Sequence, residues 1–496
     1  MLLSNLLHNI QEQNQLDLTK FNPLIKGLSF DSKEIKKNFI FFAIKGTKQD
    51  GHQFINEAIR KGAILIIIDN KKIIKLLIRK KINFIFCKNS RILLSKISSN
   101  FYPRQPKFIS AVTGTNGKTS VLHITKEIWK NCNISSATMG TIGLITDNFK
   151  KNLSLTTMDS IKFHQTLYSL YKKKIHYVCI ETSSHGLEQN RVDNVKINTA
   201  AFTNFSHDHL DYHKNFKLYF KSKMRLFKDL LMKNGNAIIN SDIPESKSIE
   251  KLCKKYNKKI VSYGFKSKNL QLLKYKSEED YQRVFFKYKN SEFNFKLPLF
   301  GNFQIYNALC AFAIILSSGF TIKQCIKNIQ QINQIPGRLE KINTPKRLKK
   351  NNISIFIDYA HTPDALEKVL RTLKTMSINK LSVVFGCGGN RDLKKRPLMG
   401  KIAKKIADKI YITDDNPRNE LPKKIRNDIL KTCPGAIEIA NRFQAIKYAI
   451  KKSEFGEILL IAGKGHEDYQ ILGKTVRKFS DKDTVLKILK NKSFYS

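Results

Sequence analysis

Residues 111–120 read AVTGTNGKTS, and these residue types suit the binding of a phosphate group. Glycines let backbone N–H groups face an anion, and the start of a helix adds partial positive charge. We predict a strand before this loop and a helix after it, with Lys118 reaching the β- and γ-phosphates and the Thr119 hydroxyl holding Mg²⁺. A strict GxxxxGK[ST] loop needs glycine at position 112, where this chain has Val112. The alternative is an ordinary strand-to-helix turn with a capping threonine, and the flanking strand and helix favour the nucleotide site.

Two polar segments that follow predicted strands supply candidate metal ligands. CIETSSHG places Glu181 at the end of a buried strand. NFSHDHLDYH packs five titratable side chains into seven residues, namely His207, Asp208, His209, Asp211 and His213. Carboxylates are plentiful and no cysteine lies nearby, which favours Mg²⁺ over zinc. A solvated polar loop is the alternative, and the phosphate loop at a neighbouring strand end favours a triphosphate–metal site.

Short apolar runs alternate with helical patterns along the chain, which predicts an α/β fold in three domains. We expect residues 1–105 to form a small α/β domain and residues 106–335 a central domain with a P-loop-like, mostly parallel sheet. Residues 336–496 should form a Rossmann-like third domain. Its predicted strands cover residues 353–358, 381–386, 409–414 and 457–463. Several of the predicted strands are followed directly by polar or glycine-rich segments. In open α/β sheets, ligands bind beyond the carboxyl ends of the strands.

Composition limits the remaining function classes. The net charge of +49 resembles that of a nucleic-acid binder, but the lysines spread along the whole chain rather than clustering. We therefore expect no specific nucleic-acid partner, and only weak polyanion binding at low salt. The apolar runs are far shorter than the ~20 residues that span a bilayer, and the N-terminus lacks a signal-peptide pattern. Eight cysteines without CxxC spacing indicate reduced thiols in a cytoplasmic protein.

A set of motifs then carries a family resemblance. GTNGKTS, TSSHGLEQNRV, TNFSHDHLDYH, DYAHTPDALEKVL, FGCGGNRDLKKRPLMG, DDNPRNE and AGKGHEDYQ occur in this order from the central region to the C-terminus. Together they resemble the Mur ligases of peptidoglycan synthesis, and among them the ligases that add 2,6-diaminopimelate. The N-terminal third matches more thinly, mainly through SFDSKEIKKNFIFFAIKGTKQDG.

The resemblance implies a UDP-substrate domain, a central ATPase domain and a C-terminal domain for the incoming amino acid. It implies ATP-dependent amide formation through an acyl phosphate, with ATP and Mg²⁺ as cofactors. The implied partners are small molecules: UDP-N-acetylmuramoyl-L-alanyl-D-glutamate, meso-diaminopimelate and ATP. We expect the chain to act as a monomer.

The resemblance also implies roles for individual residues. The implied catalytic residues are Lys118, Glu181, His209 and Lys223. Thr119, Glu181, His209 and Lys223, the last as a carbamate (N6-carboxylysine), are implied metal ligands. The ATP site would comprise Gly114, Thr115, Asn116, Gly117, Lys118, Thr119, Ser120, Asn307, Arg338 and Asp358. The muramoyl-peptide site would comprise Phe30, Ser32, Thr156, Thr157, Ser183, Gln189 and Arg191. The diaminopimelate pocket would comprise Arg391, Asp415, Asn416, Pro417, Arg418, Gly463 and Glu467.

Three departures from the family pattern and three alternatives stay open. Gln304 stands where the family carries an asparagine, Leu155 precedes Thr156 where an asparagine is common, and residues 46–51 match loosely. Folylpolyglutamate synthetase uses similar ATP motifs, but DNPR and GKGHEDYQ argue against it. A basic P-loop NTPase acting on nucleic acid would need a clustered basic stripe or stacking aromatics. A non-catalytic binding protein is disfavoured by the intact motif set.

Overall fold

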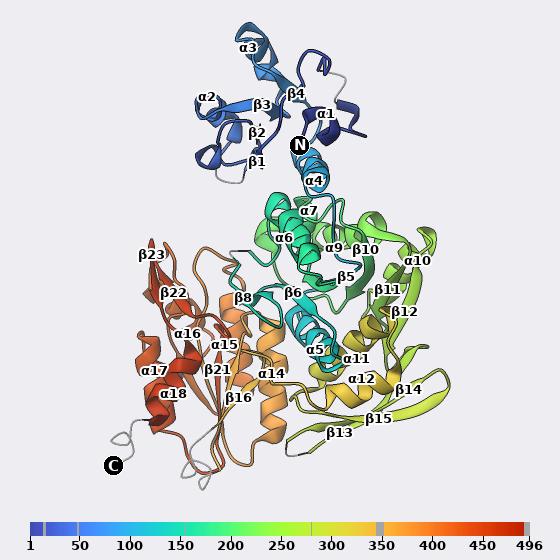
Figure 1. Cartoon of the computed structure of the whole chain (residues 1–496). Helices are drawn as coiled ribbons and strands as arrows, with labels where there is room; N and C mark the ends of the chain where they lie inside the picture. The colour runs from blue at the N-terminus through green and yellow to red at the C-terminus, as the bar shows by residue number, and fades with distance from the viewer. Residues whose placement is uncertain (13–15, 47–48, 154, 279, 344–351, 491–496) are drawn as a thin grey trace.

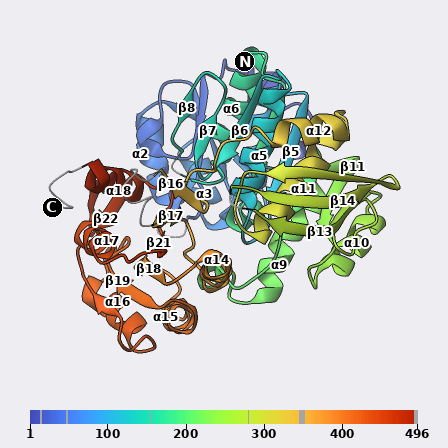
Figure 2. The same ribbon diagram turned by 90° about the horizontal axis from the view of Figure 1, so that it is seen from below.

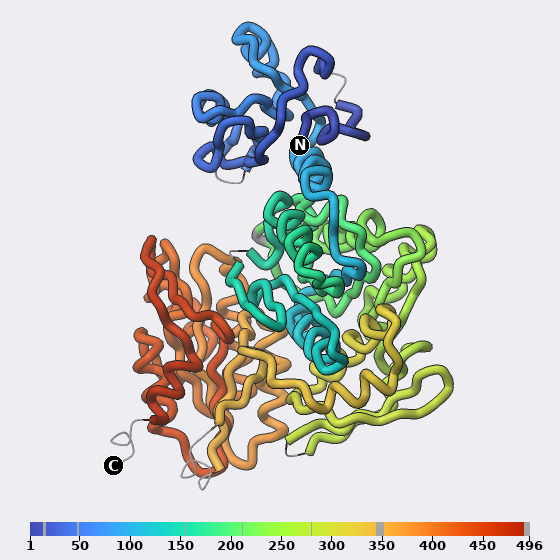
Figure 3. The backbone as a smooth tube through the Cα atoms, in the orientation of Figure 1, coloured from blue at the N-terminus to red at the C-terminus, as the bar shows by residue number. Residues whose placement is uncertain are grey.

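The computed structural model describes residues 1–12, 16–46, 49–153, 155–278, 280–343 and 352–490. Three sheet-based regions follow one another along the chain (Figure 1). The first region stands at one end and connects to the second through a single helix, as the backbone tube makes plain (Figure 3). No helix in these ranges is both long enough and apolar enough to cross a membrane.

The N-terminal region holds a four-stranded parallel sheet in the order β1-β2-β3-β4, with apolar side chains packed on both faces. Its strands are β1 (Gly27–Ser29), β2 (Phe39–Phe42), β3 (Ala63–Ile68) and β4 (Phe84–Phe86). Its helices are α1 (Leu3–Leu6), α2 (Ile55–Arg60), α3 (Ile74–Arg79) and α4 (Ser90–Phe101), with short 3-10 turns at η2 (Ser32–Glu34), η3 (Gly51–Phe54) and η4 (Lys71–Ile73). α4 leads out of this region, and the Ser95 hydroxyl on it donates to the Asp193 carbonyl at 2.6 Å.

The central region holds an eleven-stranded sheet in the order β15-β14-β13-β12-β11-β10-β5-β9-β6-β7-β8. Its strands are β5 (Phe108–Thr113), β6 (Ser136–Gly140), β7 (Gly143–Ile145), β8 (Lys150–Lys151), β9 (Tyr177–Glu181), β10 (Ile197–Phe202), β11 (Leu231–Asn240), β12 (Lys259–Gly264), β13 (Leu270–Ser277), β14 (Gln282–Tyr288) and β15 (Ser291–Leu297). The seven strands from β13 to β6 pair in parallel, and antiparallel hairpins extend both edges. The prediction of a mostly parallel sheet is therefore confirmed for the seven central strands. The antiparallel strands at both edges were not predicted.

Helices cover both faces of this sheet. One face packs against α5 (Lys118–Asn131), α11 (Asn302–Ser317) and α12 (Ile322–Ile329). The other packs against α6 (Ser160–Lys172), α7 (Ser184–Glu188), α9 (Phe216–Arg225), the π-helix η5 (Leu226–Leu230) and α10 (Ser246–Lys255). The short α8 (Leu210–His213) precedes α9. β5 lies between β10 and β9, so the loops after all three strands meet at one edge.

The C-terminal region holds a six-stranded sheet in the order β16-β17-β21-β18-β19-β20, parallel except for β16 at its edge. Its strands are β16 (Glu340–Ile342), β17 (Ser354–Asp358), β18 (Leu381–Phe385), β19 (Lys409–Ile412), β20 (Ile437–Glu438) and β21 (Ile458–Ala462), and a separate hairpin is formed by β22 (Tyr469–Leu472) and β23 (Thr475–Lys478). α14 (Pro363–Met376), α15 (Lys395–Ile406) and α16 (Pro422–Leu430) cover one face, and α17 (Arg442–Lys451) and α18 (Asp481–Lys490) cover the other. The insertion of β21 between β17 and β18 creates a crevice at the carboxyl ends of the strands, where doubly wound sheets bind ligands.

The central and C-terminal regions lie side by side, with α14 turned toward the central region in both views (Figures 1 and 2). Asp364 in the first turn of α14 accepts hydrogen bonds from Asn116 Nδ2 at 2.9 Å and from Ser206 Oγ at 3.2 Å. The carboxyl ends of both sheets therefore face a shared space.

Candidate active site

The phosphate loop joins β5 to α5 as the sequence predicts, and its shape requires glycine at two positions. Gly117 directly precedes α5 with φ +84°, and a Cβ there would lie 2.5 Å from Asn307 Oδ1. At Gly114, with φ +142°, a Cβ would lie 2.0 Å from Thr203 Oγ1. The Lys118 ammonium donates to the carbonyls of Gly114 at 3.0 Å and Thr115 at 2.8 Å. The ammonium is thus held over the loop, where a phosphate bound to the backbone N–H groups would meet it.

A cavity of about 940 Å³ opens between the central and C-terminal regions over this loop. Its lining includes residues predicted for all three substrates. From the phosphate loop and the ATP set these are Thr115, Asn116, Gly117, Lys118, Thr119, Ser120, Asn307, Arg338 and Asp358. From the other sets they are Thr156, Glu181, Ser183, His209, Arg391, Asp415, Asn416, Arg418, Gly463 and Glu467. Residues far apart in the sequence thus share one space.

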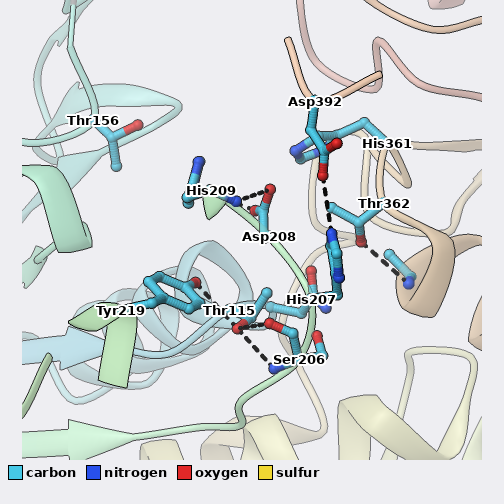
Figure 4. A network of polar contacts seen from close by, with 12 residues as sticks. Thr115, Thr156, Ser206, His207, Asp208, His209, Tyr219, His361, Thr362 and Asp392 are labelled. Atoms are coloured by element: carbon cyan, nitrogen blue, oxygen red, sulfur yellow. Dashed lines mark hydrogen bonds and ion pairs between the residues drawn. The ribbon is translucent and has the colours of Figure 1, made fainter. Parts of the chain in front are cut away.

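Glu181 ends β9 and His209 follows β10, the strands on either side of β5, and both residues line the cavity. The Glu181 carboxylate is almost fully buried and accepts hydrogen bonds from the backbone N–H and the hydroxyl of Thr141, both at 3.0 Å. His209 adopts a left-handed backbone (φ +54°), and its Nε2 lies 3.3 Å from Asp208 Oδ2 (Figure 4). Burial lowers the pKa of His209 to about 3, so its imidazole is neutral near pH 7 and has a lone pair for a metal.

These side chains suit a magnesium ion that takes most of its ligands from substrate phosphates and water rather than from the protein. Among the described residues, no three His, Cys, Asp or Glu side chains gather closely enough to hold a metal by themselves. Mg²⁺ is commonly bound by one or two protein groups plus substrate phosphates and water. Glu181, His209 and the Thr119 hydroxyl line the cavity beside the phosphate loop, which suits that mode of binding. The side chain of Asp211, named in the sequence cluster, lies outside the described part of the structure.

Lys223 on α9 lies directly behind the phosphate loop. Its Nζ donates to the Gly114 carbonyl at 2.8 Å and lies 4.6 Å from the centre of the Tyr219 ring. The residue is 1% exposed. Burial, with the charge of Lys118 acting in the same direction, lowers the pKa of Lys223 well below its ordinary value. Lys118 and Lys223 thus converge on the same carbonyl oxygen.

The residues predicted for the muramoyl-peptide fall into two groups. Thr156 and Ser183 line the cavity, and the Thr156 hydroxyl lies 3.2 Å from that of Thr141. Thr157, Gln189 and Arg191 form a network behind it: Arg191 donates to the Thr157 carbonyl and to Gln189 Oε1, both at 2.7 Å.

Phe30 and Ser32 lie in the N-terminal region, outside the lining of this cavity. Phe30 is 41% exposed, whereas Ser32 is buried and donates to Glu57 Oε2 at 2.8 Å. The structure therefore does not bring these two residues together with the phosphate loop.

The predicted adenosine and phosphate contacts are linked through hydrogen bonds. Arg338 Nη2 donates to Thr119 Oγ1 at 3.1 Å, and its guanidinium lies 4.4 Å from the centre of the Tyr359 ring. Asp358 ends β17 and accepts from the backbone N–H groups of Leu339 and Ala360, while burial raises its pKa to about 6.

The departure at Gln304 has a local consequence. Its Oε1 accepts a hydrogen bond from Asn307 Nδ2 at 2.9 Å, and the side chain is fully buried. Gln304 therefore orients Asn307 from behind the cavity. Leu155, at the second departure, is 43% exposed beside Thr156.

The predicted diaminopimelate residues gather at the carboxyl ends of β18, β19 and β21. Asn416 Nδ2 donates to Glu467 Oε2 at 3.0 Å, and Arg418 Nη1 donates to the Gly389 carbonyl at 3.0 Å. Gly463 has φ +112°, and a Cβ there would lie 2.8 Å from Asp415 Oδ2. Arg391 also lines the cavity, and Pro417 belongs to the loop between Asn416 and Arg418 without joining the lining. Two cationic and two anionic side chains thus face the same part of the cavity.

Sequence reasoning gave no role to several residues that hold the site together. Asp364, in the quoted segment HTPDAL, bridges α14 to the phosphate loop. Asp392 pairs with His207 Nε2 at 2.9 Å across the two regions (Figure 4). Thr141 supports Glu181, and Lys464 contacts Asn416 and Glu467. Asp364, Asp392 and Lys464 lie within motifs that the sequence displays, but only the fold reveals their partners.

Comparisons with known proteins agree with this architecture. Three family models match: "Mur ligase family, catalytic domain" at residues 24–103, "Mur ligase middle domain" at 112–315, and "Mur ligase, glutamate ligase domain" at 337–465. The UDP-N-acetylmuramoyl-L-alanyl-D-glutamate--2,6-diaminopimelate ligase of Rickettsia rickettsii is 43% identical over 474 residues, covering 94% of this chain and 96% of that protein.

Solved structures share the fold. A structure of a UDP-N-acetylmuramoyl-L-alanyl-D-glutamate--2,6-diaminopimelate ligase matches with a TM-score of 0.67 at 30% identity, covering 94% of both chains. A folylpolyglutamate synthase of Mycobacterium tuberculosis matches with a TM-score of 0.62 at 15% identity, covering 75% of this chain and 92% of that one, and this likeness concerns the fold alone. From the three matching models and the full-length relatives, the chain belongs to the Mur ligase family.

Proposed function

We propose that this protein is an ATP-dependent amide ligase that joins meso-2,6-diaminopimelate to UDP-N-acetylmuramoyl-L-alanyl-D-glutamate. The observation that carries the proposal is the single cavity that contains both a phosphate loop and a pocket of paired charges. The 43% identity to ligases of this name supports the same assignment.

The reaction needs a poor electrophile, the substrate carboxylate, to be activated. An oxygen of this carboxylate attacks the γ-phosphorus of ATP and the bond to ADP breaks, which gives an acyl phosphate. The amine of the amino acid then attacks the acyl carbon, a proton leaves the nitrogen, and phosphate departs with the formation of an amide. Both steps bring anions together, so cations placed in advance lower the barrier.

The chain supplies such cations around the phosphate loop. Lys118 offsets charge on the β- and γ-phosphates, while Arg338, held by Thr119 and Tyr359, supplies a second positive charge. Glu181, His209 and Thr119 would hold Mg²⁺, which when bound neutralises phosphate charge as a Lewis acid. Thr156 and Ser183, which line the same cavity, would contact the carboxyl end of the substrate.

Lys223 is proposed to act as a carbamate. Its neutral amine would attack CO₂ and lose one proton, which converts a buried cation into an anionic oxygen ligand. A bare ammonium beside a divalent cation would be repelled. The burial of Lys223 beside Gly114 and its lowered pKa favour this chemistry.

At the other end of the cavity, Arg418 and Arg391 would receive the distal carboxylate of diaminopimelate, and Glu467 and Asp415 its ammonium. Arginine offers a planar fork that pairs with a carboxylate through two hydrogen bonds. We further propose that residues 1–105, 106–335 and 336–496 act as UDP-substrate, ATPase and amino-acid domains of a cytoplasmic monomer.

Phosphate release tests the proposal. The purified protein is incubated with ATP and Mg²⁺, with and without UDP-muramoyl-dipeptide and diaminopimelate. We expect release to require all substrates and to yield a product heavier than the dipeptide substrate by diaminopimelate minus water. Ligation of glutamate to a folate instead would contradict it and favour a folylpolyglutamate synthetase.

A further inference from the structure

Lys464 is a fully buried cation behind the proposed amino-acid pocket. It follows β21, has 0% exposed side chain, and lies outside the cavity lining. Its Nζ lies 3.0 Å from Glu467 Oε2 and 3.2 Å from Asn416 Oδ1. Lysine is almost never fully buried unless it is paired, and both of its hydrogen-bond partners here line the cavity.

The contacts of Lys464 close a three-residue network. Asn416 Oδ1 also accepts from the Ile471 backbone N–H at 2.9 Å, and Asn416 Nδ2 donates to Glu467 Oε2 at 3.0 Å. The Glu467 carboxylate oxygen that meets Asn416 is thus the same one that meets Lys464. This arrangement fixes Glu467 and Asn416 in one orientation before any ligand arrives.

Lys464 also changes the charge of the pocket. In the lining of the amino-acid pocket, two cations, Arg391 and Arg418, stand with two anions, Asp415 and Glu467, so the charges of these four side chains cancel. With Lys464 behind it, three cations stand against two anions. Burial raises the pKa of Glu467, and Lys464 opposes that shift, which favours the ionised carboxylate. Charges on side chains as buried as Lys464 and Glu467 interact more strongly than charges in water.

We propose that Lys464 is a positioning residue that makes the pocket select an amino acid ending in an ammonium and a carboxylate over one ending in an ammonium alone. The excess positive charge repels a lone ammonium, and a side chain with both groups adds no net charge at its end. The inference rests on the proposed function, because it assumes that this pocket receives the incoming amino acid.

The test compares diaminopimelate with lysine in wild type and in Lys464→Met, which keeps length and removes charge. We expect kcat/KM for diaminopimelate to fall about 10- to 100-fold and its ratio to that for lysine to fall about tenfold or more, with KM for ATP little changed. Lys474→Met, an exposed lysine at the tip of the β22–β23 hairpin, is the matched control and should leave the ratio unchanged. An unchanged ratio in folded Lys464→Met would overturn the inference, because a merely structural loss lowers kcat/KM for both amino acids by the same factor.

A second variant covers the case in which Lys464→Met does not fold. Glu467→Gln removes an anion and leaves three cations against one, so the preference for diaminopimelate over lysine should rise even as both substrates bind less well. A preference that stays constant or falls contradicts the charge argument. Failure of the wild type to ligate diaminopimelate at all would instead refute the proposed function, so the two failures are distinguishable.

Discussion

The two ends of the cavity are built in different ways. At the phosphate end, residues 115–120 of one loop line the cavity together with residues from other strand ends, and two lysines, Lys118 and Lys223, converge on the Gly114 carbonyl. At the amino-acid end, loops after three strands each contribute part of the lining, and cations alternate with anions. The phosphate end therefore gathers two lysines around a loop whose backbone N–H groups suit an anion, whereas the amino-acid end presents paired charges that suit the distinction of similar ligands. Losing a charge should abolish turnover at the first end and change substrate preference at the second.

The largest effect is expected at the phosphate end. Lys118→Ala removes the cation nearest the β- and γ-phosphates, and we expect kcat to fall by about 10²- to 10³-fold or more with the fold intact. Turnover is measured as phosphate release, and folding by circular dichroism and thermal unfolding. Lys130→Ala, an exposed lysine in the last turn of the same helix, is the control and should retain activity. Near-normal ligation by folded Lys118→Ala would remove the distinction between the two ends.

Lys223→Ala should also abolish most activity, because a carbamate oxygen ligand is lost. Small carboxylic acids added to the variant should restore part of it by occupying the vacated space. Lys221→Ala, two residues away and exposed on α9, serves as control. Full activity of Lys223→Ala, or the absence of rescue across a series of short acids, would count against the carbamate.

Arg418→Ala tests the amino-acid end. Losing one charge-assisted contact costs roughly 1.5–3 kcal/mol, so KM for diaminopimelate should rise about 10- to 150-fold while KM for ATP changes little. The wild type should use lysine poorly. Comparable kcat/KM for lysine and diaminopimelate in the wild type contradicts the assignment of this pocket.

The smallest effect is expected where the two ends are joined. Asp364→Ala removes the acceptor for Asn116 and Ser206, and if the two contacts together are worth about 0.5–1.5 kcal/mol, we expect KM for ATP to rise about 2- to 10-fold. KM for diaminopimelate should stay near its original value. Glu367→Ala on the same helix breaks only a surface pair with Arg371 and is the control. An equal rise in both KM values would show that α14 serves both ends alike.

Local sequence patterns were sufficient for much of the fold. The predicted runs at 353–358 and 381–386 match β17 (Ser354–Asp358) and β18 (Leu381–Phe385), because buried parallel strands are continuous apolar runs. The antiparallel edge β13–β15 was not predicted. Its signal was present at Lys289 and Asn290, which turn between β14 and β15 with φ +47° and +64°, as type I′ hairpins require.

In the candidate site too, features formed by contiguous residues could be predicted and contacts between distant residues could not. The phosphate loop could be predicted because strand, glycine turn and helix are contiguous. The contacts of Asp364 with Asn116 and of Lys464 with Asn416 could not, because these partners lie 248 and 48 residues away and no spacing rule links them. The placement of Phe30 and Ser32 outside the cavity likewise depends on how the N-terminal region is attached.

The backbone of Arg418 is tied to the β22–β23 hairpin by two main-chain hydrogen bonds. The Arg418 N–H donates to the Ile471 carbonyl at 3.1 Å, and the Gly473 N–H donates to the Arg418 carbonyl at 2.7 Å. A substitution at position 418 would keep both of these bonds. The charge at position 418 can therefore be changed without removing the two main-chain bonds that tie this residue to the β22–β23 hairpin.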